Sequence, residues 1–224
     1  MCIRDSHPSS SVRPDGGTRE RHLTTDGVSV VRIGGRQGSV TAQPGGRLPA
    51  PAHLAPLQDL LNTVNLESGE DELAPAAFGA WCAVRGVGDA DEGDRTRLQA
   101  FREDLRAWVE AGGEQVPAEV AGAVAAARLQ VAVDDGRLTT TSGTAFGRLV
   151  AETVEGIRVA QRENDWKRFK VCSRGSCRWA FYDHSRNNSS RWCASTICGA
   201  REKSRRAYRR RVAPADPSGT AGEA

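Results

Sequence analysis

The chain has 224 residues, enough for one domain with an appendage or for two small domains. Its net charge is only +3, and its 38% hydrophobic and 26% charged residues are typical of a soluble protein somewhat poor in core material. No apolar run approaches the roughly 18 residues that a membrane-spanning helix needs, which excludes an integral membrane protein. A secretory signal contains an apolar segment of about 7–15 residues, and the start of the sequence has none, so we expect a cytoplasmic location.

The first 50 residues differ from the rest of the chain. They are rich in Gly, Pro, Ser, Thr and Arg and poor in large apolar residues. Residues 28–33 could form one short strand, but Gly34-Gly35 and Gly45-Gly46 interrupt the pattern. The opening Met-Cys-Ile-Arg-Asp-Ser also resembles translated sequencing-adapter read-through. We therefore expect residues 1–50 to be mostly disordered and partly artefactual.

Hydrophobic periodicity predicts a mainly helical body over residues 51–165. In the strongest helix, Leu98, Phe101 and Leu105 belong to one apolar stripe, and Gly112-Gly113 ends it. The predicted helices span residues 54–64, 72–85, 92–111, 117–127 and 144–160. The last helix is expected to be capped by Thr144 or Ser142.

Between the fourth and fifth predicted helices the period changes to two. Leu129, Val131 and Val133 alternate with smaller or polar residues, residues 134–136 form a turn, and residues 137–141 return. This pattern predicts a β-hairpin. The fold class is therefore predicted to be mainly α with one small β-hairpin.

The near-neutral net charge hides a sharp division along the chain. Residues 51–165 carry a net charge of −10, whereas residues 166–212 carry +12. The basic segment also holds 7 of the 12 aromatic residues, and disordered basic tails are usually poor in aromatics. We therefore expect residues 166–212 to fold as a separate module that binds a polyanion, followed by a disordered tail over residues 213–224.

Four cysteines in the basic segment form two pairs with the same spacing. Cys172 and Cys177 are separated by four residues, as are Cys193 and Cys198. Two short loops that each supply two thiolates can close a tetrahedral zinc site. The alternative is a pair of disulfides, which needs an oxidising compartment, and no export signal is present. We therefore predict one structural Zn²⁺ that staples a small C-terminal module.

The metal is needed because a short cationic segment cannot bury enough apolar area to fold unaided. A structural zinc site supplies an apparent ~10–16 kcal/mol. His184, which lies between the two pairs, is a possible replacement ligand, and Phe181 and Trp192 can cover the sulfurs. Cys2 and Cys82 lie outside the pattern, and Cys82 is expected to be a small core residue.

We do not expect an enzyme. A zinc ion with four cysteine ligands has no open position for substrate or water. The sequence also lacks a P-loop, a dinucleotide-binding glycine motif, a metalloprotease motif and a hydrolase nucleophile elbow.

A basic helix is predicted directly after Cys198. Its positive residues recur three and four positions apart, and such like-charge pairs destabilise a helix unless a polyanion neutralises them. Duplex DNA is the favoured partner. The candidate nucleic-acid contacts are Arg186, Asn187, Arg191, Arg201, Lys203, Arg205, Arg206, Arg209 and Arg210.

Two other binding functions remain open. The basic module could dock on an acidic protein surface, including that of its own body, which carries nearly the opposite charge. RNA binding is also possible, because Trp179, Phe181 and Tyr182 could stack on bases. These aromatics are nevertheless expected in the core, since a small module has few other hydrophobic residues to bury.

The run from Cys172 to Lys203 resembles the CGNR zinc finger, in particular Phe181-Tyr-Asp-His-Ser-Arg-Asn187, Arg191-Trp-Cys193 and Cys198-Gly-Ala-Arg201. The preceding body resembles the ABATE domain that usually accompanies this finger, through Leu60-Leu-Asn-Thr63, Leu73 and Trp81. The resemblance covers about residues 54–211.

The resemblance implies a bacterial, stress-induced transcription regulator with a zinc-dependent DNA-binding module, associated with the nucleoid. It implies ligand roles for all four cysteines, and the body would act as a sensor or form a homodimer. Nothing in the sequence identifies a small-molecule signal. One residue departs from the family: its characteristic Asn is Ala200 here, so any contact made by that Asn is absent.

Overall fold

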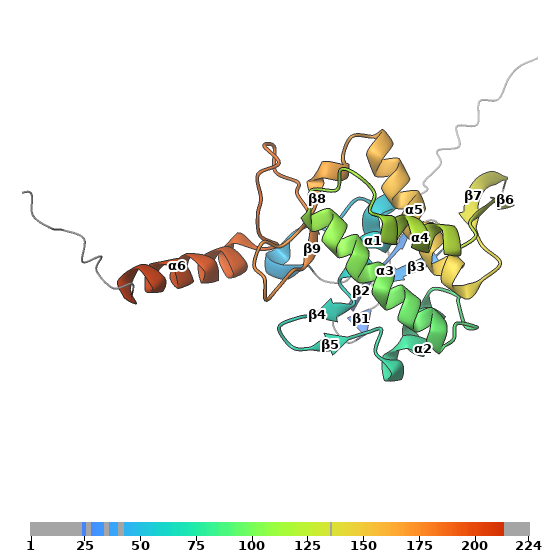
Figure 1. Ribbon diagram of the computed structural model, residues 1–224, viewed down its shortest axis with the longest axis horizontal. Helices are drawn as coiled ribbons and strands as arrows, with labels where there is room; N and C mark the ends of the chain where they lie inside the picture. Colours follow the sequence, from blue (N-terminus) through green and yellow to red (C-terminus); the bar gives the residue numbers. More distant parts are fainter. Residues whose placement is uncertain (1–23, 26–27, 34–35, 40–42, 135, 213–224) are drawn as a thin grey trace, which may run out of the picture.

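The computed structural model describes residues 24–25, 28–33, 36–39, 43–134 and 136–212. As expected, the fold is mainly helical with a compact cysteine-containing module at the C-terminal end. The helices are α1 (Ala55–Leu61), α2 (Pro75–Val84), α3 (Glu92–Glu110), α4 (Ala118–Ala126), α5 (Ala145–Arg162) and α6 (Ala200–Val212). Figure 1 shows helices α1 to α5 gathered in one body and helix α6 leading away from it.

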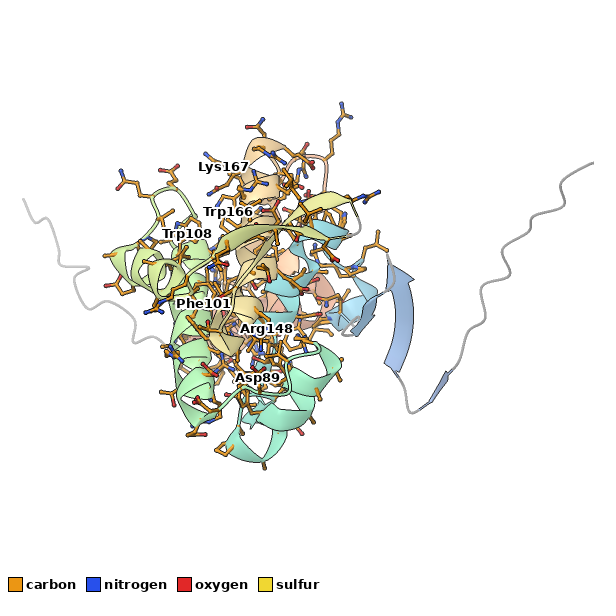
Figure 2. All side chains as sticks on the ribbon, turned by 90° about the vertical axis from the view of Figure 1, so that its right-hand side faces the viewer. Asp89, Phe101, Trp108, Arg148, Trp166 and Lys167 are labelled. Carbon is orange, nitrogen blue, oxygen red and sulfur yellow. The ribbon has the colours of Figure 1, made fainter. Side chains whose placement is uncertain are left out.

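Helices α3 and α5 form the centre of the body, and both pack against α1. The predicted stripe on α3 is buried, with Leu98 and Leu105 0% exposed and Phe101 1% exposed. Phe101 meets Phe146 of α5 edge to face, with 6.4 Å between the ring centroids. Figure 2 shows Phe101 and Trp108 along α3. The apolar stripes of the two long helices thus build the core.

Helix ends follow the local capping chemistry. The Asp91 carboxylate accepts a hydrogen bond from the Asp94 amide, and the Asp94 carboxylate accepts one from the Asp91 amide, which completes a capping box at the start of α3. The Thr144 hydroxyl accepts a hydrogen bond from the Gly147 amide at 3.0 Å, so Thr144 caps α5 as predicted. Among the described residues, no helix is long and apolar enough to cross a membrane.

Two predicted helices differ at their ends. The first was expected to continue to residue 64, but α1 ends at Leu61 because the Asn62 side chain bonds to a strand of the C-terminal module. The second was expected from residue 72, but α2 begins at Pro75. Leu73 nevertheless lies in the core, 0% exposed, on the segment that leads into α2.

The predicted hairpin forms, but it is accompanied by other small antiparallel sheets. Strands β6 and β7 pair from Gln130 opposite Thr141 to Asp134 opposite Arg137. The fold class is therefore as predicted, with further small sheets beside the hairpin; most of the additional strand pairs join only two or three residues and leave no clear period in a sequence. The strands are β1 (Thr24–Thr25), β2 (Val28–Ile33), β3 (Arg36–Ser39), β4 (Val64–Asn65), β5 (Glu70–Asp71), β6 (Gln130–Asp134), β7 (Arg137–Thr141), β8 (Phe169–Val171) and β9 (Ala180–Tyr182).

The N-terminal segment also differs from expectation in its described part. Strand β2 covers residues 28–33, for which the sequence allowed one short strand, and it pairs with β1 and β3 in an antiparallel sheet that the sequence did not predict. The expected disorder of the remaining residues of this segment stays a prediction. A 3-10 turn, η1 (Pro44–Gly46), follows and lies against the C-terminal module. Residues 1–23 and 213–224 lie outside the described residues, as does Cys2.

The body and the C-terminal module share one hydrophobic core. The cluster that contains the body's leucines also includes Phe169, Val171, Ala180 and Tyr182 of β8 and β9. Trp166, in the 3-10 turn η3 (Trp166–Arg168), packs 5.0 Å from Trp108 between ring centroids and donates a hydrogen bond to the Gly113 carbonyl at 2.8 Å. The two parts are therefore packed together and are not separated by a free linker.

Two polar side chains fix the position of the module. Asn62 accepts a hydrogen bond from the Ala180 amide at 2.8 Å and donates one to its carbonyl at 2.9 Å. Arg106 of α3, only 1% exposed, donates to the carbonyls of Leu61 and of Arg178, the latter at 2.7 Å. The Arg106 guanidinium thus joins the end of α1 to the strand edge of the module.

Replacing Arg106 by Met should lower the free energy of unfolding by about 3 kcal/mol, because two carbonyls at the junction lose their donor. Urea denaturation followed by circular dichroism measures this loss. The control is Arg158→Met, since Arg158 is 55% exposed and forms an ion pair with Glu155 of its own helix, and its change should stay within about 0.5 kcal/mol. Equal losses in the two variants would contradict the assigned role of Arg106.

Candidate metal centre

The four cysteines lie on two turns that face each other. Cys172 follows β8, and its amide donates to the Trp179 carbonyl at 2.9 Å. Cys177 closes a turn by donating its amide proton to the Arg174 carbonyl at 2.8 Å. On the second turn, Cys198 lies in a short π-helix, η4 (Ser195–Gly199), which leads directly into α6. The metal centre therefore forms the base of α6.

The sulfur positions fit one tetrahedral metal ion. All four Sγ atoms lie within 4.8 Å of one another. The Cys177–Cys193 and Cys193–Cys198 sulfur distances are 3.7 and 3.6 Å. Zn–S bonds of about 2.3 Å in a tetrahedron place sulfurs about 3.8 Å apart, whereas a disulfide needs about 2.05 Å. The four cysteines are unpaired and hold the geometry of one zinc site, not of two disulfides.

The surroundings of the sulfurs exclude water. Cys172, Cys193 and Cys198 are at most 2% exposed, and Phe181 is fully buried beside them. The Trp192 ring lies against Gly199, where a Cβ atom would come within 3.2 Å of the ring. The predicted cover of Phe181 and Trp192 over the thiols is confirmed.

The thiols cannot all ionise together without a cation. Hydrogen bonds from Cys177 and Cys193 lower the pKa of Cys172 far below its usual range. The same contacts with Cys172 raise the pKa values of Cys177 and Cys193. A divalent ion removes this conflict because a coordinated thiol is deprotonated outright. The chemistry of the donor set therefore fits zinc.

The remaining candidate ligands lie elsewhere. His184 is exposed, and its Nε2 donates to the Pro49 carbonyl at 2.9 Å, so it is not one of the clustered ligands. Cys82 is buried in the body core, and burial raises its pKa to about 11. It is therefore an inert core thiol, as predicted.

Sequence reasoning missed one residue that supports the centre. The Arg47 guanidinium donates to the carbonyls of Cys193 at 2.7 Å, Tyr182 at 3.1 Å and Trp192 at 3.2 Å. It also lies 4.6 Å from the centroid of the Phe181 ring. A single arginine in a segment rich in Gly and Pro carries no periodic signal, so only the fold identifies it.

The turn between β9 and Cys193 is organised by one buried carboxylate. Asp183, 0% exposed, accepts hydrogen bonds from Lys170 at 2.9 Å, from the Ser185 amide at 3.0 Å and from Ser190 at 2.8 and 2.7 Å. Burial raises its pKa, but these hydrogen bonds outweigh it and lower the pKa well below the usual range. The turn that presents Arg186 and Asn187 is therefore firmly held.

All nine candidate nucleic-acid contacts are exposed. Arg186, Asn187 and Arg191 lie on the turn before Cys193, and the others lie on α6. Arg201 is already paired: Glu67, in the turn between β4 and β5, accepts from it at 2.8 and 3.1 Å and also binds Arg174. The structure thus divides the candidates into a turn group and a helix group.

The helix group is presented on an exposed helix. Helix α6 has no buried residue, and its main contact is with η4 at its own base. Figure 1 shows it leading away from the body, so the expected alternative of α6 docked on the acidic body does not hold. Within α6, Glu202 pairs with Arg206 at 3.4 Å and Arg205 at 3.9 Å.

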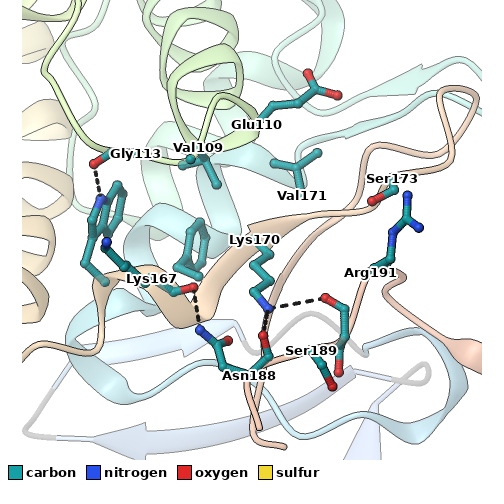
Figure 3. Close-up of a pocket in the computed structure, with 14 residues that line it drawn as sticks. Val109, Glu110, Gly113, Lys167, Lys170, Val171, Ser173, Asn188, Ser189 and Arg191 are labelled. Carbon is teal, nitrogen blue, oxygen red and sulfur yellow. Dashed lines mark hydrogen bonds between the residues drawn. The ribbon is translucent and has the colours of Figure 1, made fainter.

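A hollow of about 530 Å³ lies between the end of α3 and the module (Figure 3). Three of its charged side chains are already paired: Lys170 binds Asp183 and the carbonyls of Asn188 and Ser190, Glu110 binds Arg178 at 2.8 Å, and Lys167 lies 3.6 Å from Glu114. The fourth, Arg191, lies over the Trp192 ring, 5.8 Å from its centroid. The residues that line this hollow therefore offer no set of charges that converges on a ligand.

Removing the metal should unfold the two cysteine turns and release α6. Cys193→Ser should lose the one zinc ion that is retained after dialysis, together with part of the helical circular dichroism signal. Cys82→Ala, outside the cluster, should retain that ion. Elemental analysis measures the zinc content, and stoichiometric zinc in the Cys193 variant would rule out the four-sulfur site.

Comparison with known proteins identifies the same segment. Residues 168–211 match the family model of the CGNR zinc finger, and this range contains all four clustered cysteines. A search of curated proteins gave no match. The CGNR zinc finger is a binding module and not an enzyme family. This part of the chain is thus a zinc-binding finger module whose cysteines are consistent with one zinc ion.

Proposed function

We propose that this protein binds DNA and acts as a bacterial transcription regulator. The observation that carries the proposal is α6, a helix with six arginines, one lysine and no buried residue, rooted on the zinc centre. An amphipathic helix usually buries an apolar face, but α6 buries no face in the described structure. Its natural partner is a surface of dense negative charge.

The charge pattern of α6 favours phosphate over a protein surface. Lys203, Arg206 and Arg210 recur at spacings of three and four, and Arg205 and Arg209 lie four residues apart. These like-charge neighbours destabilise an isolated helix. Duplex DNA carries about one charge per 1.7 Å and releases condensed counterions when cations bind, which provides a large favourable term.

The finger is suited to present this helix in a fixed direction. The zinc cluster holds its first turn through Cys198, and Glu67 holds Arg201 beside it. The family's Asn is Ala200 here, and Ala200 is exposed at the start of the helix. We propose that Ala200 leaves helix formation intact and removes only the contact that the Asn would make.

We propose an ABATE-like role for the body, as a sensor or dimerisation unit joined to the finger. Arg106 and Asn62 provide the physical link, because both tie α1 and α3 to the finger backbone. A change in the packing of these helices is thereby transmitted to the base of α6.

The alternatives have less support. RNA stacking needs exposed aromatic faces, but Phe181 is 0% and Tyr182 7% exposed. Trp179 is half-buried, and its Nε1 donates a hydrogen bond to the Gln43 side chain at 3.2 Å. Docking on an acidic partner protein is favoured by one observation, the pairing of Glu67 with Arg174 and Arg201. A gel shift with mixed duplex DNA at low salt separates the proposals, because an absent shift would support the protein partner.

Replacing Arg205, Arg206, Arg209 and Arg210 by Gln should weaken DNA binding and flatten its salt dependence. The slope of log affinity against log salt should fall by about 0.9 per lost phosphate contact, and so by up to ~3.6. Fluorescence anisotropy over a salt series measures both quantities.

The control variant loses the same number of positive charges, but from the body. It replaces four exposed arginines by Gln: Arg97, Arg137, Arg158 and Arg162. The affinity and slope of this control should match those of the unmodified protein. An unchanged slope in the α6 variant would remove the basic helix from the mechanism.

We further propose a homodimer through β6. Val131, Val133 and Leu138 are 73%, 72% and 77% exposed. Val133 lies opposite Leu138 in the ladder, and Val131 is two residues away, so all three share one face. Within the described structure β6 pairs only with β7, and the hairpin lies at the end of the body remote from α6 (Figure 1).

The occupant that fits this edge is a second copy of the chain. The strand reads Gln-Val-Ala-Val-Asp, which is almost symmetric about Ala132. Antiparallel pairing of two β6 strands about Ala132 sets Val131 against Val133 of the partner subunit and the neutral Gln130 against the acidic Asp134 of the partner subunit. No like charges are opposed, as a two-fold interface requires.

Val133→Lys should convert the dimer to a monomer because it places two like charges at this interface. Val116→Lys, at a 52% exposed valine outside the hairpin, should remain dimeric. Sedimentation equilibrium measures both masses. A monomeric unmodified protein at all concentrations, or a dimeric Val133 variant, would refute this contact.

A further inference from the structure

A second group of metal-binding side chains lies outside the cysteine centre. His53 comes from the 3-10 turn η2 (Ala52–Leu54), Glu163 caps the C-terminus of α5, and Asp165 precedes η3. Each offers one ligand atom, and the three atoms lie within 4.8 Å of one another. Two segments far apart in the sequence thus bring an imidazole and two carboxylates together.

Two atoms in this group lack the partners that buried polar atoms normally have. His53 Nε2 and Asp165 Oδ1 are both screened from solvent, and neither makes a hydrogen bond in the described structure. A buried polar atom without a partner is costly, so each such atom needs an explanation. A bound cation would satisfy both atoms.

The spacing of the ligand atoms also fits a metal. His53 Nε2 lies 3.3 Å from Asp165 Oδ2 but does not form a hydrogen bond with it. Metal–nitrogen and metal–oxygen bonds of about 2.0–2.1 Å in a tetrahedron place two ligand atoms about 3.3–3.4 Å apart. The separation fits two ligands that share one ion; without an ion, a protonated His53 forms an ion pair with Asp165 at the same distance.

The fold holds these residues in place from several sides. A Cβ at Gly156 would come within 1.9 Å of the His53 carbonyl, so this glycine allows η2 to lie directly on α5. Tyr182 of the finger donates its hydroxyl to Asp165 Oδ2 at 3.3 Å, and the Asp165 amide donates to the Ala160 carbonyl at 3.1 Å. A hydroxyl that orients a ligating carboxylate is a typical outer contact of a metal site.

The local electrostatics favour a cation. The site lies at the C-terminus of the 18-residue helix α5, where the helix dipole is negative. The nearby Arg168 is directed elsewhere, since it donates to the carbonyls of Asp183 at 3.0 Å and Ser185 at 2.8 Å. Glu163 is exposed, so an ion can enter and leave from solvent.

We propose that His53, Glu163 and Asp165 bind a second divalent ion of the zinc type, with water completing its coordination. One imidazole and two carboxylates suit a borderline divalent ion, and the lack of sulfur makes the site weaker than the cysteine centre. Through Tyr182 the ion ties η2 and α5 to strand β9, so it stabilises the junction between body and finger. The proposal does not depend on DNA binding.

The test is a titration of the full chain that already holds zinc at its cysteines. Co²⁺ added to this protein should bind with one further equivalent, measured by calorimetry. Its absorption should lack the thiolate charge-transfer band, because no sulfur is present. His53→Ala and Glu163→Gln should each weaken this binding at least tenfold, since loss of even an outer contact typically costs about 10–100-fold.

The controls keep the charge and residue type matched. Glu155→Gln removes another carboxylate from α5, and His184→Ala removes an exposed histidine of the finger. Both should bind the extra equivalent as the unmodified protein does. Glu163 is exposed, so its variant is expected to fold normally. Absence of a second equivalent, or equal binding in the Glu163 and Glu155 variants, would overturn the proposal.

Discussion

The structure of the finger depends on the neutralisation of four cysteine thiols that lie within 4.8 Å of one another. Thiols at this distance oppose one another's ionisation, as the divergent pKa shifts of Cys172 and Cys193 indicate. A divalent cation converts that repulsion into four bonds. Because Cys198 lies in the turn that leads into α6, the same bonds fix where the basic helix begins. The metal therefore fixes the direction in which α6 leaves the finger as well as the fold of the finger.

The second constraint is the set of backbone carbonyls that the finger presents to side chains outside it. Arg47 binds three of them, Arg106 binds that of Arg178, and Asn62 binds that of Ala180. A loop stapled only by a metal would be free to rotate relative to the body. These donors remove that freedom, since each satisfies a group that would otherwise be left unpaired at the junction. The finger and body therefore respond together to any event that changes the packing of α1 or α3.

The sequence predicted those features that repeat. The apolar stripes of α3 and α5 and the two C-x4-C pairs each have a period or a spacing, and the structure agrees with them. Contacts made once between distant residues leave no such trace. Nothing in the sequence links Arg47 to Cys193, or Glu67 to Arg201, because each pair is set by tertiary packing over more than 100 residues. The end of α1 was misjudged for the same reason: Asn62 is the C-cap of α1, and its side chain bonds to Ala180, 118 residues away.

The arginines of α6 differ in whether a carboxylate pairs with them, and the paired ones lie near the metal centre. Near the metal centre, Glu67 binds Arg201, and hydrogen bonds from Arg174 and Arg201 lower the pKa of Glu67, so it stays ionised. Glu202, the next residue, pairs with Arg205 and Arg206 about one turn further along the helix. Arg209, Arg210 and Arg211 have no ion pair among the described residues. On the proposed function, phosphate therefore meets the distal arginines without competition and must displace a carboxylate only at the base. Exposed ion pairs contribute about 0–1 kcal/mol, so this competition orders the contacts without preventing them.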